Sequence, residues 1–173
     1  MPSILIYVKK NAINSALDKC REWLLPFGLD IECEQTELPD GILGEYEHDS
    51  VFTKTVLVRI CPENIRKECD ELCHDLDARD ARKFLNNELK LTILHELGHA
   101  LVNQMLDWYW EIPERHNHVE TEMMDRFFDV FDDENMAEED LVETFARHFL
   151  HGRPDQLKGC FEKLDAFITQ NNI

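Results

Sequence analysis

TILHELGHAL, at residues 92–101, places two histidines four positions apart, His95 and His99. On a helix, residues at this spacing share one face about one turn apart, so both imidazoles can point at one cation. Glu96 lies about 100° around the helix from His95, beside such a cation rather than among its ligands. Two imidazoles, a third protein ligand and a water form the open site typical of catalytic zinc. We therefore predict one Zn²⁺ per chain, held by His95 and His99, with Glu96 as general base on a zinc-bound water.

The residues around the motif favour a buried helix over a chance match on a solvated one. No proline occurs from residue 86 to residue 106, so a helix can run through the whole stretch. A chance match on a solvated helix would normally carry charged residues on its outer face. The neighbours here are instead uncharged: Thr92, Ile93, Leu94, Leu97, Gly98, Ala100 and Leu101.

This extended motif resembles the active-site helix of the zincin metallopeptidases. It differs from the metzincin variant, which has glycine and histidine where this chain has Val102 and Met105. The resemblance is therefore to the glutamate zincins, in particular to their small single-domain forms and to the lethal-factor type. It implies peptide-bond hydrolysis with a peptide or protein as substrate, and a third zinc ligand that is a glutamate on a later helix.

Five glutamates downstream of the motif are candidates for that third ligand: Glu120, Glu122, Glu138, Glu139 and Glu143. Glu120 and Glu122 lack an acidic residue one turn later, and Glu138 pairs with Asn135 in a capping pattern. Glu139 and Glu143 remain, on a largely apolar helix face where a carboxylate is costly to bury unless a cation compensates it.

The stretch EDLVETFARHFL, residues 139–150, also resembles the glutamate helix of lethal-factor-type zincins, in which the first glutamate is the ligand. The resemblance implies that Glu139 binds zinc. Glu143 would then accept the imidazole N–H of a ligand histidine and fix its orientation. Zincins also supply a donor to the developing oxyanion. The sequence does not choose among four candidates for that role: Tyr109, His116, His118 and His151.

Periodicity predicts mixed secondary structure in a single domain spanning residues 1–173. Alternating or β-branched stretches predict strands at residues 3–9, 31–37, 42–48 and 54–61, with a turn at 39–41. Helical spacing predicts helices at residues 11–25, 62–75, 79–105, 119–131 and 135–151 and from residue 154 onward, with a break near residues 86–87. With the resemblance, this predicts an α+β zincin-like fold, in which a small mixed sheet lies over the active-site helix and the C-terminal half is helical. Residues 42–48 are the predicted edge strand, which in zincins pairs with substrate backbone.

The composition limits the classes of partner. A formal net charge of −18 over 173 residues argues against binding to nucleic acid or to anionic membranes. An acidic solvated surface is the simplest explanation of this charge. If the charge instead lines the cleft, a preference for basic peptides follows. The longest early apolar run, residues 4–8, is too short for a membrane span or a signal peptide. We therefore expect a cytoplasmic protein.

Six cysteines could suggest disulfides, but a chain with 43% hydrophobic residues does not need them to fold. Reduced, structural thiols are the prediction. Cys69 and Cys73 share a helix face next to His74, so a second metal site there is an alternative. Two further alternatives concern function: a metal-binding regulatory module that cleaves nothing or a single partner, and a zymogen whose C-terminal segment fills the cleft. An intact Glu96 favours an enzyme, because metal binding alone does not require it.

Overall fold

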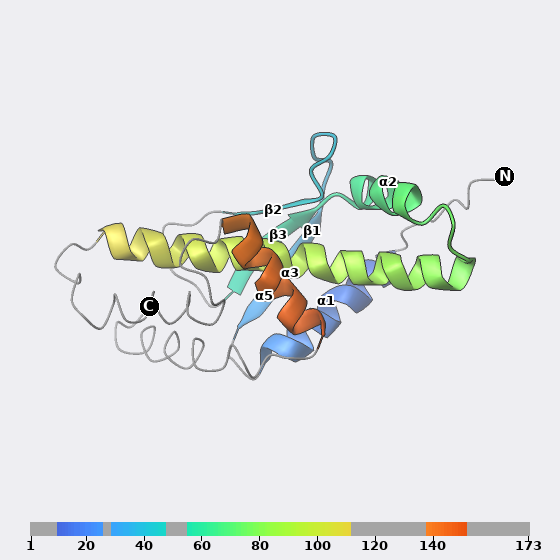
Figure 1. The fold of residues 1–173 in the computed structure, drawn as a ribbon. Helices are drawn as coiled ribbons and strands as arrows, with labels where there is room; N and C mark the ends of the chain where they lie inside the picture. The colour runs from blue at the N-terminus through green and yellow to red at the C-terminus, as the bar shows by residue number, and fades with distance from the viewer. Residues whose placement is uncertain (1–9, 26–28, 48–54, 112–137, 152–173) are drawn as a thin grey trace.

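The computed structural model describes residues 10–25, 29–47, 55–111 and 138–151 of the chain (Figure 1). Its elements are, in chain order, α1 (Lys10–Leu24), β1 (Asp30–Gln35), β2 (Gly44–Tyr46), β3 (Thr55–Ile60), α2 (Pro62–Leu72), α3 (Ala78–Glu111) and α5 (Glu138–Leu150). This arrangement confirms a mixed α+β fold with a small sheet and a mostly helical content. The predicted strand at residues 3–9 and the predicted helices at 119–131 and from 154 onward lie outside the described residues.

The sheet has the strand order β1-β3-β2. β3 is the central strand, parallel to β1 and antiparallel to β2, so the sheet is mixed as predicted. Alternate residues of β3 are buried, because successive side chains of a strand point to opposite faces. On the outer face, Arg59 forms ion pairs with Glu34, Glu45 and Glu47. Within the described part of the chain no further strand pairs with β2, which is therefore an edge strand, as predicted.

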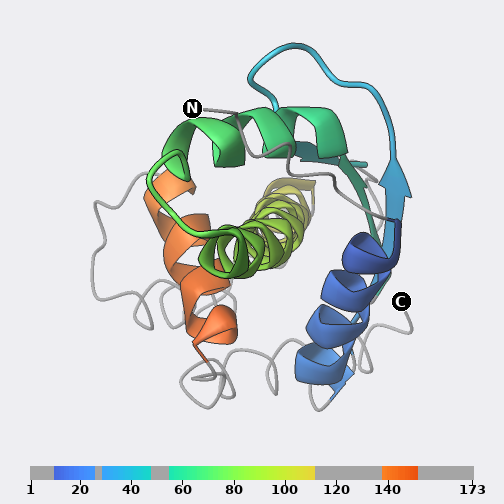
Figure 2. The same cartoon turned by 90° about the vertical axis from the view of Figure 1, so that its right-hand side faces the viewer.

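The helix α3 is the central element of the fold. It runs without interruption through 34 residues and is packed against α1, α2, α5 and the sheet. Figure 2 looks along α3 and shows α2, α5 and α1 arranged around it. The predicted break near Asn86 and Asn87 is wrong. Leu85 and Leu89 on either side are buried, and their packing outweighs the few tenths of a kcal/mol by which asparagine disfavours a helix.

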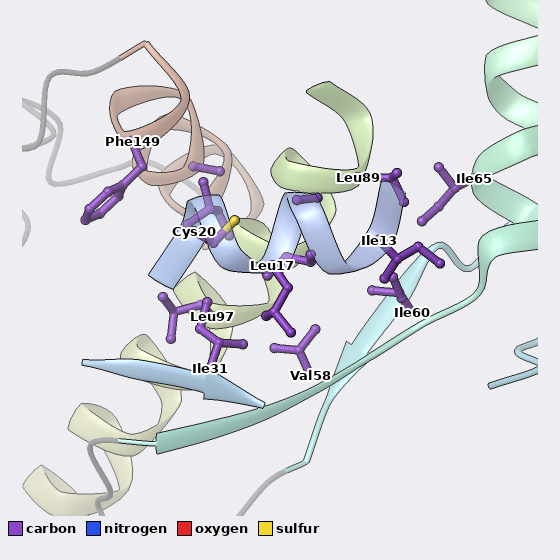
Figure 3. Packing of buried hydrophobic residues seen from close by; sticks show 14 of the residues in the cluster. Ile13, Leu17, Cys20, Ile31, Val58, Ile60, Ile65, Leu89, Leu97 and Phe149 are labelled. Carbon is purple, nitrogen blue, oxygen red and sulfur yellow. The ribbon is translucent and has the colours of Figure 1, made fainter. Parts of the chain in front are cut away.

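The core lies where α1, the sheet and α3 meet. Figure 3 shows Val58 of β3 pointing toward Leu17 of α1, and Ile31 of β1 pointing toward Leu97 of α3. All four side chains are at most 9% exposed. The predicted helix at residues 11–25 and the predicted strands at 31–37 and 54–61 are thus confirmed, with ends shifted by one or two residues.

The loop before β2 is fixed by Asn64 of α2, a buried polar residue. Its Nδ2 donates hydrogen bonds of 2.8 Å to the carbonyl oxygens of both Pro39 and Ile42. The loop itself turns at Gly41, whose φ of 83° lies in the left-handed region that favours glycine. This confirms the predicted turn at residues 39–41, and it holds β2 in place beside α3.

Two general expectations can be compared with these residues. None of the described helices is both long enough and apolar enough to cross a membrane. The described cysteines are free thiols, as predicted: Cys20, Cys33, Cys61, Cys69 and Cys73. Cys160 lies outside the described residues.

Candidate metal centre

The structure brings together the three side chains that the sequence assigns to zinc. The Nε2 atoms of His95 and His99 lie 3.0 Å apart. The carboxylate of Glu139 reaches across from α5, with one oxygen 3.3 Å from His95 Nε2 and the other 3.4 Å from His99 Nε2. Among the described residues, these are the one group of at least three potential ligands whose atoms all lie within 4.8 Å of one another.

These separations fit a zinc ion. Zinc bonds to imidazole nitrogen and carboxylate oxygen at about 2.0–2.2 Å, so the ligand atoms of a tetrahedral site are about 3.3–3.5 Å apart. The separation of the two Nε2 atoms is 3.0 Å, and the nearest carboxylate oxygen of Glu139 is 3.3 Å from one of them and the other oxygen 3.4 Å from the second, all close to that spacing. Two imidazoles and one carboxylate are also the ligand types of a catalytic site with one open position. The residues present therefore suit zinc in both chemistry and spacing.

The surroundings of His95 favour its neutral form. Burial lowers the pKa of His95, and the neighbouring His99 lowers it further, whereas Glu139 and Glu143 act in the opposite direction. A neutral imidazole is the form that binds a metal. Both histidine side chains are largely enclosed, at 24% and 14% exposed, while Glu139 is 74% exposed. The group is thus open on the α5 side.

Glu143 lies one turn after Glu139 and faces the other nitrogen of His95. Its Oε2 is 3.7 Å from His95 Nδ1, slightly longer than a hydrogen bond. Its Oε1 forms an ion pair with Arg147, one turn further along α5. Arg147 therefore holds the carboxylate beside the ring. The role predicted for Glu143, as a partner of a ligand histidine rather than a ligand, stays a prediction, with its carboxylate next to that ring.

A close approach of α5 to α3 makes these contacts possible, and it depends on Gly98. A Cβ atom at Gly98 would lie 3.0 Å from the Cβ of Val142 and 3.3 Å from Cδ1 of Phe145. Both partners on α5 are buried. The glycine in HELGH thus lets α5 lie directly against the motif helix, one turn from Glu139.

Glu96 lies on the other side of the histidines, under β2. Burial raises the pKa of the Glu96 carboxyl to about 7. The neighbouring His99 acts against this rise, and the negative charges of Glu139 and Glu45 add to it. A Cβ atom at Gly44 would lie only 2.9 Å from Glu96 Cγ and 3.1 Å from Glu96 Oε1. The strand β2 therefore forms the wall against which the Glu96 side chain is held.

Tyr46 is a residue of the site that sequence reasoning missed. Its ring stacks on that of His99, with centroids 6.3 Å apart and planes within 13° of parallel. It follows Gly44 by two positions, so both residues face α3. Residues 42–48 carried a weak strand signal, but nothing local indicated that the inward face of this strand would meet the motif helix.

A cleft of about 890 Å³ contains the whole group. β2 with the loop before it, α2, α3 and α5 all contribute to its lining, which includes Tyr46 and Arg147. Six glutamates line it: Glu45, Glu68, Glu88, Glu96, Glu139 and Glu143. Burial, followed by the charges of Glu68 and Glu143, raises the pKa of Glu88. The cleft is thus acidic, both beside the histidines and further from them.

The other candidates from the sequence do not join this group. His151 is exposed beyond the end of α5 and does not line the cleft. Cys69 and Cys73 are buried, and burial raises the pKa of Cys69 to about 12, while His74 is exposed beside Asp75. The remaining candidates lie outside the described side chains: Tyr109, His116, His118, Glu120, Glu122 and Glu138.

Comparisons of the chain with known protein families, with curated proteins and with solved structures found no match. The geometry of His95, His99, Glu139 and Glu96 is therefore the basis for any conclusion on function.

Proposed function

We propose that this chain is a zinc-dependent peptidase of the zincin type, with His95, His99 and Glu139 as its metal ligands. One observation carries the proposal: two imidazoles and a carboxylate, the ligand types that zinc prefers, have their nearest donor atoms 3.0–3.4 Å apart in an acidic cleft that also contains Glu96. A metal site without hydrolysis would not need a carboxylate held beside the ligands by a neighbouring strand.

Bound zinc would lower the pKa of a water molecule towards neutrality and polarise the scissile carbonyl. Glu96 would accept a proton from the attacking water and deliver it to the leaving amine, which is general acid–base catalysis by one carboxylate. Glu143, held by Arg147, fixes the ring of His95. Tyr46 stacks on His99 and limits the rotation of that ring.

The substrate in this proposal is a peptide that lies along β2. On either side of β2, the backbone N–H of Glu47 donates to the carbonyl of Leu57, and the carbonyl of Leu43 accepts from the N–H of Cys61. The odd-numbered residues from 43 to 47 therefore turn their N–H and C=O groups towards β3. The peptide groups of Gly44 therefore turn towards the open edge of the sheet, where an extended chain can pair with them. The glutamates of the cleft favour substrates with basic side chains.

Metal analysis of the purified protein tests the ligand set. We expect about one zinc per chain, and we expect its loss in the double variant His95→Ala/His99→Ala. His74→Ala is the matched control, because His74 is an exposed histidine on a different part of the chain. If the double variant kept its zinc, the metal would lie elsewhere and the proposal would fail.

A cleavage assay on a peptide library separates an enzyme from a metal-binding module. We expect cleavage by the zinc-loaded protein, its loss after chelation, and its recovery when zinc is added back. A zinc-loaded protein that cleaves none of the peptides would instead support the regulatory module.

A further inference from the structure

A row of basic side chains lies on the N-terminal half of α3. Arg79, Arg82, Lys83 and Lys90 line a shallow hollow of about 660 Å³ together with Asn86 and Asn87. Arg79, Arg82 and Lys83 are exposed, and Lys90 is half-buried. No acidic residue is among the described residues that line the hollow. Arg79 stands three positions before Arg82 and four before Lys83, and like charges at these spacings weaken a helix slightly.

These four side chains differ from the other basic residues of the protein. Elsewhere in the described part of the chain, each lysine or arginine whose side chain is described forms an ion pair with a carboxylate. They are Lys19, Arg21, Arg59, Arg66, Lys67 and Arg147. The four residues of the row make no such pair with any described residue; Lys90 instead faces the ring of Trp23, 5.9 Å from its centroid. In a chain with a net charge of −18, four cations that pair with no carboxylate among the described residues are a strong exception.

The basic row lies on the side of α3 opposite the cleft. Successive residues of a helix are about 100° apart, so Lys90 is about 200° around the helix from Glu88, which lines the cleft. A partner bound to the basic row would therefore not block access to His95. The row is a separate surface.

We propose that the basic row is a docking site for an acidic segment of a second protein. From Arg79 to Lys90 the row is about 16 Å long, the length of about five residues of extended chain. A segment of that length with several carboxylates can pair with all four cations, and the carboxamides of Asn86 and Asn87 can bond its backbone. The cations supply the complementary charge, while the acidic remainder of the surface repels partners that are negative throughout.

Charge complementarity favours an acidic polypeptide over nucleic acid. A nucleic acid strand continues beyond the ends of the row and meets the acidic surface there, so repulsion offsets the gain at the row. A protein segment can change composition after a few residues. The interaction should weaken with added salt, because the contacts are exposed.

Fluorescence anisotropy with a labelled peptide of eight glutamates tests this proposal on the full chain as purified. Mass spectrometry confirms that the peptide stays intact. We expect saturable binding at low salt, weakened at least tenfold by Arg82→Glu/Lys83→Glu. Arg82→Gln/Lys83→Gln should weaken it less, in proportion to the smaller change in charge. The matched control is Arg66→Glu/Lys67→Glu on α2, which changes the net charge equally at an adjacent arginine and lysine outside the row. Its affinity should change less than threefold.

Three outcomes would overturn the proposal. The first is no binding by the wild-type protein, as would occur if another part of this chain occupied the row. The second is equal weakening by the control variant, which would show a response to net charge alone. The third is tighter binding of an eight-residue thymidine oligonucleotide than of the peptide. Zinc content does not enter these measurements, so their failure leaves the peptidase proposal untouched.

Discussion

Replacement of Gly44 by alanine should slow catalysis without removing zinc. The new Cβ would lie 2.9 Å from Glu96 Cγ and 3.0 Å from Thr92 Cγ2. Carbon atoms in contact are normally about 3.5–4.0 Å apart, so the Glu96 side chain or β2 has to move by about half an ångström or more. A displacement of 1 Å in a catalytic group can reduce the rate about 100-fold. We therefore expect kcat of Gly44→Ala to fall about tenfold.

The measurement compares kcat, KM and zinc content in Gly44→Ala, Gly41→Ala and the wild type. Gly41 has a φ of 83°, and a Cβ atom there would have no neighbour within 4 Å, so alanine strains the backbone without touching Glu96. Gly41→Ala should lower the melting temperature and leave kcat within about twofold. Glu96→Asp in the Gly44→Ala background shortens the crowded side chain, and it should reduce kcat less than the two single effects combined.

The reasoning would be refuted by a Gly44→Ala variant with wild-type kcat, because β2 would then not hold the Glu96 carboxylate. Loss of zinc from this variant would refute it in a different way. It would mean that β2 supports the histidines rather than the general base.

Further predictions concern α5 and the thiols. Gly98→Ala should push α5 away from α3 and so reduce zinc retention in mild chelator, whereas the control Gly44→Ala should keep its zinc. Equal zinc retention in the two variants would show that the position of α5 does not depend on the close approach at Gly98. Glu139→Ala should lose zinc in mild chelator, whereas Glu143→Ala should weaken zinc affinity only about 10- to 100-fold. Greater zinc loss from Glu143→Ala than from Glu139→Ala would mean that Glu143 is the ligand and Glu139 its outer partner. Burial raises the pKa of both Cys20 and Cys69 to about 12, so at pH 8 each should react with iodoacetamide about 1,000-fold more slowly than a thiol with a pKa of 9. Rapid labelling of the native protein, followed by mass spectrometry, would contradict this.

The sequence predicted the parts of the fold that depend on local periodicity. His95 and His99 share a face because of the helical repeat alone, and the apolar spacing along α1, β3 and α3 indicated their buried sides. The edge position of β2 was also predicted, although the strand is shorter than expected. Its helix-facing residues are Gly44 and Tyr46, and neither adds a strong apolar signal.

The parts that could not be predicted depend on how distant elements pack. The contact between Gly44 and Glu96 joins residues 52 positions apart in sequence, and no local pattern encodes it. The stacking of Tyr46 on His99 has the same origin. The predicted break near residues 86–87 was wrong for the opposite reason. Local propensity suggested a break, but buried leucines on both sides hold α3 continuous.

The role of Glu96 is tested most directly by Glu96→Gln at equal zinc loading. The amide keeps the shape of the side chain but cannot accept a proton, and general-base catalysis contributes about 10²- to 10⁴-fold to the rate. We expect Glu96→Gln to bind zinc as the wild type does and to cleave the same peptides at least 100-fold more slowly. Cleavage at the wild-type rate by the zinc-loaded variant would contradict the proposed mechanism.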